Sequence, residues 1–256
     1  NNEILSFVEN SNKKDSLYWE AARPIILTNE EVKDYKVKDS IQVLKKSKTY
    51  LDSIDKKDNK FKIADILMGY SYKNTHKNQY LNFSSVLLGT RFNTVQGWNP
   101  SLDISFYTSD EEAGSSFSAR TNFNYGLSDE KLRATASFSY LFNSISKPYL
   151  QVSGGEKITQ FNQSEPISSL INSVSTLFFE ENYAKFYDKT YAKVLFSDEL
   201  TNGIRMQSSL SYEKRSPLVN TTDYVLLNDK QKTYTSNDPL NENNTGIPSF
   251  EEHKVY

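Results

Sequence analysis

Residues 98–142 read WNPSLDISFYTSDEEAGSSFSARTNFNYGLSDEKLRATASFSYLF, and this stretch decides the fold class. Apolar and polar residues alternate in it over three runs, residues 98–107, 117–127 and 132–142. Successive side chains of a β-strand point to opposite faces, so each run predicts a strand with one apolar and one polar face. Polar turns separate the runs, one of them at Ser128–Lys131. The stretch therefore predicts a closed antiparallel meander.

The same alternation extends on both sides of this stretch. Residues 63–72 predict a first strand, and residues 80–92 are extended but alternate less cleanly. A shorter strand at residues 149–155 ends in two glycines, which mark a bend or close packing. Alternation resumes near residue 192, and Asn202–Gly203 predicts a tight hairpin turn. Residues 250–256 start a further extended segment, so we expect the sequence to be an excerpt of a longer protein.

Two regions have a helical period instead. Thr28 and Glu31 form a capping-box pattern before a helix predicted over residues 29–55, with a break near Val37–Lys38 compatible with the pattern. Ser164 and Pro166 start a second helix, which we expect to lie over a barrel end or to plug it. The predicted domains are a linker and helical lead-in over residues 1–60 and a β-barrel over residues 61–256. Residues 213–250 are expected to form a long polar loop.

The composition fits such a barrel. The hydrophobic fraction is 37%, yet the chain has 17 Tyr and 15 Phe. In a membrane β-barrel only alternate strand residues face lipid, and aromatic girdles mark both interfaces. A tyrosine-rich soluble β protein fits the same numbers. The net charge of −2 gives no reason to expect nucleic acid, and the absence of Cys excludes a disulfide framework.

The sequence predicts no catalytic, cofactor-binding or metal-binding residues. The two histidines, His76 and His253, lie in polar surroundings without a spaced pair of carboxylates, and we expect them in exposed turns. No G-x-S-x-G motif and no phosphate-binding glycine loop occurs. The acidic run Asp110–Glu112 lacks the ligand spacing of an EF-hand loop, and a solvated turn is expected there.

Four charged residues on the polar faces of the strands are the candidate lumen residues: Asp103, Arg120, Arg133 and Arg205. One interpretation is a charged lumen that selects solutes. The favoured one is a network of paired charges that braces the barrel, because buried charges need partners. On the opposite face, the aromatic residues form either an interface girdle, which is favoured, or a soluble core: Trp98, Phe117, Tyr125, Phe138, Tyr140 and Tyr212.

A succession of short motifs also carries a family resemblance. These motifs are Tyr18-Trp19 to Arg23-Pro24, Leu27-Thr28, residues 50–55, Gly69-Tyr70-Ser71-Tyr72, residues 92–98, Ser153-Gly154-Gly155, Phe178-Phe179-Glu180 and residues 220–224. In this order, the chain resembles the Bacteroidota outer-membrane proteins of unknown function that carry a carboxypeptidase-regulatory-like domain before a β-barrel. The resemblance implies a barrel distantly like the BamA-type assembly and translocation barrels, and it brings no established activity.

The expected fold is thus mainly β: a partial antiparallel transmembrane β-barrel with an N-terminal periplasmic helical segment and a loop helix. The expected function is transport or envelope-protein assembly in the cell outer membrane, without catalysis. Outer-membrane lipid and other envelope proteins are the expected partners. The rival is a soluble or surface-attached β-sandwich that binds glycan or peptide, and it predicts apolar faces that meet inside one core.

Overall fold

The computed structural model describes residues 15–25, 27–162, 164–227, 232–240, 243 and 252–255. These residues belong to two compact units, residues 1–50 and residues 51–256. The predicted extended segment at residues 250–256 is described only over residues 252–255, where it is a strand.

The first unit is helical. Helix α1 spans Ser16–Ala22 and α2 spans Asn29–Lys46. The predicted capping box is confirmed, since Thr28 and Glu31 each accept a hydrogen bond from the other's backbone N–H. The helix predicted over residues 29–55 is interrupted, but at Ser47 and not near Val37–Lys38: α2 ends at Lys46, the extended Ser47 follows, and α3 spans Lys48–Asp58, most of it in the second unit. None of the helices in the described ranges is both long and apolar enough to cross a membrane.

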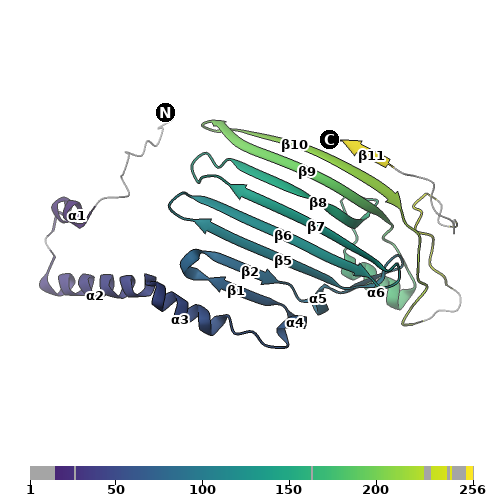
Figure 1. The fold of residues 1–256 in the computed structure, drawn as a ribbon, viewed down its shortest axis with the longest axis horizontal. Helices are drawn as coiled ribbons and strands as arrows, with labels where there is room; N and C mark the ends of the chain where they lie inside the picture. Colours follow the sequence, from purple (N-terminus) through teal and green to yellow (C-terminus); the bar gives the residue numbers. More distant parts are fainter. Residues whose placement is uncertain are drawn as a thin grey trace. The chain divides into compact units, whose positions relative to one another are not determined.

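The second unit contains one nine-stranded sheet whose neighbouring strands are all antiparallel, which confirms the mainly β class (Figure 1). Its order is β1-β2-β5-β6-β7-β8-β9-β10-β11. The strands are β1 Tyr70–Asn74, β2 Gln79–Phe83, β5 Ser101–Asp110, β6 Ser115–Gly126, β7 Lys131–Leu141, β8 Tyr149–Gln160, β9 Phe186–Thr201, β10 Ile204–Pro217 and β11 Glu252–Val255. Over the described residues the sheet is open, with β1 and β11 at its edges.

Several predicted strand boundaries need correction. The strand predicted over residues 63–72 contains the short helix α4 (Asp65–Met68), because β1 starts only at Tyr70. The extended residues 80–92 contain β2 and the short helix α5 (Val86–Gly89). Trp98 lies not in the large sheet but in β4 (Gly97–Asn99), which pairs with β3 (Arg91–Asn93). Strand β10 runs on to Pro217, so the long connection starts later than expected.

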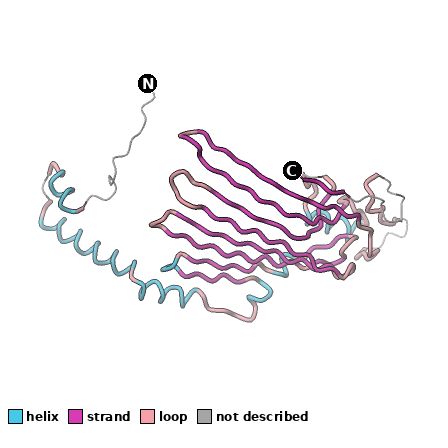
Figure 2. The backbone as a smooth tube through the Cα atoms, turned by 45° about the horizontal axis from the view of Figure 1, so that its top comes forward, coloured by secondary structure: helices cyan, strands magenta, loops and turns pink. Residues whose placement is uncertain are grey.

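The two ends of the strands differ in their connections. At one end the turns are short, as at residues 111–114 and 202–203. At the other end the chain inserts β3 and β4 between β2 and β5, and helix α6 (Ser169–Phe179) between β8 and β9. Figure 1 shows α6 at this end, opposite the short turns, and Figure 2 shows the same separation in a second view. Helix α6 starts later than predicted, with Ser168 rather than Ser164 as its N-cap.

The apolar face of the sheet is exposed. Apolar residues are cross-strand partners along it, as in Ala119↔Phe138↔Val152 and Phe117↔Tyr140↔Leu150. Large exposed apolar side chains on β6 to β10 include Phe123, Tyr125, Leu132, Phe138, Tyr140, Val152, Val194, Phe196, Met206, Leu210 and Tyr212. In the described part of the chain, the other sheet has only the two strands β3 and β4. No second layer of comparable size therefore covers this face.

The buried apolar residues lie instead at the end that carries α6. Val95, Ala184 and Phe186 form a cluster, and Ile158, Ile167 and Leu218 pack against it. Helix α6 buries Leu177 and leaves most of its other large apolar residues exposed, among them Leu170, Ile171, Val174 and Phe178. The hydrophobic core of this unit is thus small and stands beside the strand ends.

At Gly155 the β8 strand changes which residues it exposes. Val152 and Lys157 are both exposed, although their odd spacing would place them on opposite faces of a regular strand. Gly155 has φ +129°, a conformation that side chains other than glycine rarely adopt. The pairing of β7 with β8 stops at Thr135↔Gly155, and this break turns Glu156 and Ile158 towards the polar face. The predicted bend or close packing at these glycines is confirmed.

Gly155→Ala is expected to destabilise the fold by about 3 kcal/mol. A Cβ at this position would lie 2.1 Å from the Ala134 carbonyl oxygen and 2.7 Å from the Thr135 Cα, in addition to the strained φ. The matched control is Gly203→Ala, which has φ +82° but nothing within 4 Å of the added Cβ, so it should cost about 1 kcal/mol. Urea unfolding followed by circular dichroism measures both, and equal losses would contradict the steric argument.

Candidate functional site on the polar face

The four predicted lumen residues lie on four different strands, and the structure groups three of them. Asp103 of β5 and Arg120 of β6 line one cavity of about 380 Å³. Asp103 and Arg133 of β7 line a second cavity of the same volume. Arg205 lies apart, next to the β9–β10 turn, where it donates a 3.4 Å hydrogen bond to the Lys147 carbonyl oxygen. It lines neither cavity.

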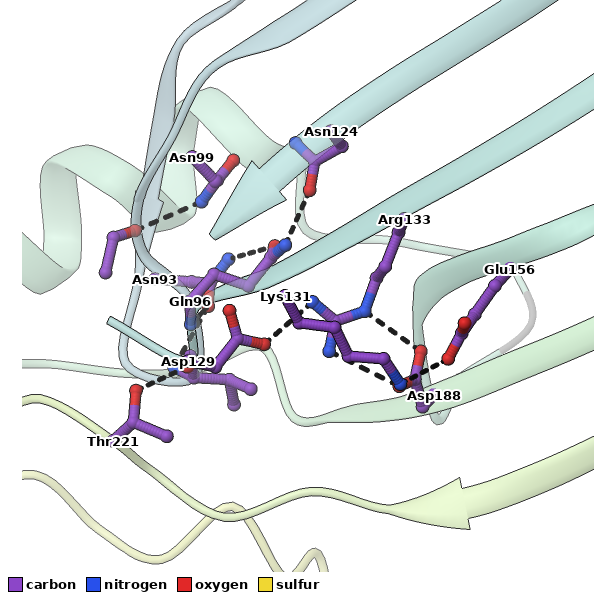
Figure 3. Close-up of polar contacts among 12 residues, drawn as sticks. Asn93, Gln96, Asn99, Asn124, Asp129, Lys131, Arg133, Glu156, Asp188 and Thr221 are labelled. Carbon is purple, nitrogen blue, oxygen red and sulfur yellow. Dashed lines mark hydrogen bonds and ion pairs between the residues drawn. The ribbon is translucent and has the colours of Figure 1, made fainter. Parts of the chain in front are cut away.

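Arg133, which is only 1% exposed, is the centre of a buried ion-pair network. Its Nε and Nη2 atoms donate to the two carboxylate oxygens of Asp188, at 3.0 and 3.3 Å. Its Nη1 atom lies 2.7 Å from Asp129 Oδ2. Lys131 Nζ also reaches Asp188 Oδ2 at 2.7 Å and contacts Glu156. Figure 3 shows these groups converging from β7, β8, β9 and the β6–β7 turn.

The network places charges of both signs in contact, with one negative charge in excess. Arg133 and Lys131 contribute two positive charges, against three negative charges from Asp129, Asp188 and Glu156. The bidentate contact between a guanidinium and a carboxylate is the strongest ion-pair geometry that side chains form. Burying such charges costs several kcal/mol per ion, which the mutual contacts must offset. The arrangement therefore holds β7, β8 and β9 together and gives this part of the polar face a fixed pattern of charge.

Next to this network lies a cluster of amide side chains that sequence reasoning missed. Within the 380 Å³ cavity beside Arg133, the lining amides are Asn93, Gln96, Asn99, Asn122, Asn124, Gln160 and Asn172. Gln96 Nε2 donates to Asn124 Oδ1 at 2.5 Å, and Asn93 Nδ2 donates to Gln96 Oε1 at 3.1 Å (Figure 3). Amides offer both donors and acceptors without charge, so this wall suits uncharged polar groups.

The segment after β10 is fastened over the same end of the sheet. Asn237 accepts a 2.8 Å hydrogen bond from the Phe186 N–H and donates to the Phe186 and Leu218 carbonyl oxygens at 2.6 and 2.7 Å. The Tyr234 hydroxyl lies 2.9 Å from the carbonyl oxygens of Thr176 and Tyr224. Burial raises the pKa of the Tyr234 phenol well above its ordinary value. The described part of the predicted long loop around Tyr234 and Asn237 is thus held by hydrogen bonds against the end of the sheet that carries α6.

The partners of Arg133 could have been found only in part from the sequence. Asp129 lies four residues before Arg133, but residues 128–131 read as a solvated turn. Asp188 is the third residue of β9, far away in the sequence, and only the strand order brings it near Arg133. No periodic signal marks such a pair.

The two histidines occupy exposed positions. His76 lies in the short 3₁₀ turn of residues 75–77, as predicted. His253 was expected in a turn but lies on β11, where its Nδ1 is 2.6 Å from the Tyr212 hydroxyl. In the part of the chain that the structure describes, no three His, Asp or Glu side chains gather in a way that could hold a metal ion.

Comparison with known proteins identifies a family. The model of a family described as "Family of unknown function (DUF5686) C-terminal domain" matches residues 64–256. The chain belongs to this family. The DUF5686 match includes every strand of the nine-stranded sheet. It begins after α1, α2 and α3, so these three helices lie outside it. No curated protein and no solved structure matches the chain. The description of DUF5686 names no activity, so function has to be argued from the structure itself.

Proposed function

We propose that this chain forms part of the wall of a β-barrel in the outer membrane of a Bacteroidota cell, with its apolar face towards lipid and its polar face towards the lumen. The barrel serves transport or envelope-protein assembly and performs no catalysis. The helices before residue 60 are its periplasmic lead-in, and other envelope proteins are its partners.

One observation carries the proposal: an extended antiparallel sheet exposes apolar side chains on one face over many neighbouring strands. Soluble monomers rarely expose a contiguous apolar patch larger than several hundred Å². Strands β5 to β10 have 10 to 16 residues, and a strand needs about 9–11 residues to cross a bilayer. Short turns at one end and longer connections at the other are also typical of outer-membrane barrels.

The polar face supports the same orientation. A lumen tolerates charged side chains when they are paired, as Arg133 is with Asp129 and Asp188. The rival, a soluble sandwich that binds glycan or peptide, needs a second apolar layer against the exposed face. Both a membrane barrel and a soluble sandwich could use the cavity beside Arg133, so this cavity does not distinguish the two functions.

Labelling of alternate residues on β8 tests the proposal directly. The chain has no cysteine, so Val152→Cys and Ser153→Cys each introduce a single labelling position, on opposite faces of the sheet. In lipid vesicles, a fluorophore on residue 152 should be quenched by nitroxide-labelled lipid, and one on residue 153 should not. Equal quenching at both positions would contradict the proposal, and so would partition of the protein into the aqueous phase without detergent.

A further inference from the structure

The cavity of about 380 Å³ beside Arg133, which we name the amide cavity after the amides in its wall, has three buried amides that are only half used. They are Asn99 at the end of β4, Gln160 at the end of β8 and Asn172 on α6. Their exposed fractions are 5%, 8% and 2%. Three separate elements thus each bring one buried amide to the same cavity.

One half of each amide is held by the protein itself. Asn99 Nδ2 donates to the Gly97 carbonyl oxygen at 3.1 Å. Gln160 Nε2 donates to the Ile167 carbonyl oxygen at 2.6 Å. Asn172 Oδ1 accepts a 3.1 Å hydrogen bond from a backbone N–H. An amide has its oxygen on one side and its nitrogen on the other, so these bonds also fix the direction of the unused half.

The unused halves are open to the cavity. Within the described part of the chain, Asn99 Oδ1, Gln160 Oε1 and Asn172 Nδ2 make no hydrogen bond. None of these atoms is fully enclosed, so each remains accessible from the cavity that its residue lines. Water can fill such positions, and a ligand that displaces the water has to match its hydrogen bonds. The cavity therefore offers two fixed acceptors and one fixed donor to a ligand.

The charges in the wall do not favour an ionic ligand. Arg133 is held by Asp129 and Asp188, and Lys131 contacts Asp188 and Glu156. The excess negative charge of this network repels an anion, and its carboxylates already contact cations. The other charged residues of the wall are exposed or half-buried, with two of each sign: Arg91, Asp103, Lys157 and Glu165. An uncharged polar ligand fits this wall best.

We propose that the amide cavity binds an uncharged saccharide. A sugar hydroxyl both donates and accepts, and the hydroxyls surround the ring, so one ring can meet acceptors and a donor from three elements. A peptide offers its N–H and C=O groups along a line and needs room for its side chains. The C–H faces of a sugar ring also suit the apolar wall residues Phe92, Ile158 and Phe186. Pockets for small molecules measure about 300–1,000 Å³, so the volume of the cavity is sufficient. The inference does not depend on the membrane.

Isothermal titration calorimetry of the full chain, in a detergent without a sugar headgroup, tests the proposal. The probes are the neutral disaccharides maltose, cellobiose and lactose, and at least one of them is expected to bind. Lactobionate, the acid derived from lactose, and the blocked tripeptide acetyl-trialanine amide are expected to bind at least about tenfold more weakly than the best disaccharide, because they carry a charge or lack the ring of hydroxyls. No binding of the disaccharides, or equal binding of either comparison ligand, would overturn the proposal.

Two variants place the binding in the cavity. Gln160→Ala removes one free acceptor and is expected to weaken binding about tenfold. Its matched control is Gln151→Ala on the same strand, because Gln151 lines neither cavity and donates to Ser137 at 2.9 Å. Asn172→Asp keeps the shape of the side chain and the acceptor that the fold uses, and it replaces only the free donor. It should also weaken binding about tenfold, while circular dichroism shows that it is folded. Unchanged affinity in Asn172→Asp, or equal weakening by Gln160→Ala and its control, would overturn the site.

Discussion

Phe138→Arg is expected to cost about 2–4 kcal/mol in the free energy of unfolding from a lipid bilayer. Phe138 lies on the apolar face of β7 and is 48% exposed, with Ala119 and Val152 as its cross-strand partners. If this face contacts lipid, an arginine there has to be dehydrated or has to distort the bilayer. Urea unfolding from lipid vesicles measures the loss.

The matched control for this change is Ser139→Arg, on the next residue of β7 and on the polar face. Ser139 contributes one hydroxyl contact, to Ser118 at 2.6 Å, so the control should cost about 1 kcal/mol. In a soluble sandwich Phe138 would face a second apolar layer, so Phe138→Arg would be as costly in water without a bilayer. A loss for Phe138→Arg no larger than that of its control would contradict the contact of this face with lipid, and a full loss in detergent-free water would favour the soluble rival.

Arg133→Met is expected to destabilise the protein by about 3–5 kcal/mol, the usual cost of breaking a buried ion pair from one side. The change leaves Asp129 without the counter-charge of Arg133, and Asp188 retains only Lys131. Equilibrium unfolding in urea measures the loss. Arg120→Met is the control, because Arg120 lies on the same polar face of the neighbouring strand and is exposed.

A second variant separates charge from packing at this position. Arg133→Met/Asp129→Asn removes the orphaned carboxylate together with the guanidinium, so it should recover a large part of the lost stability. If the double variant is as unstable as Arg133→Met alone, the loss arises from packing, and the ionic role given to Arg133 is wrong.

The sequence predicted the sheet well where one face is uniformly apolar. Strands β6 and β7 follow the alternation closely, because a period of two is a direct consequence of strand geometry. It failed where a local conformation interrupts that geometry. Gly155 reverses the faces of β8, and Trp98 belongs to a small hairpin despite its place at the start of an alternating run.

The candidate site could be predicted only one residue at a time. Arg133 stands out as a charge on a strand, but its structural role depends on the contact with Asp188. The strand order, and not the local sequence, brings Asp188 close. The amide cluster was missed because Asn and Gln in strands, turns and helices look like ordinary surface residues.

The Arg133 network also helps to fix the pairing register of β7 with its neighbouring strands, which the alternation of apolar and polar residues does not determine. A strand that slips by two residues keeps its apolar side chains on the apolar face, so the repeating pattern of β6 and β7 cannot select one alignment. Such a slip would move Arg133 by about 7 Å along the strand and break its contact with Asp188 of β9. The native alignment of β7 is thus favoured over the slipped one, because a slip would leave the buried Asp188 without its guanidinium partner.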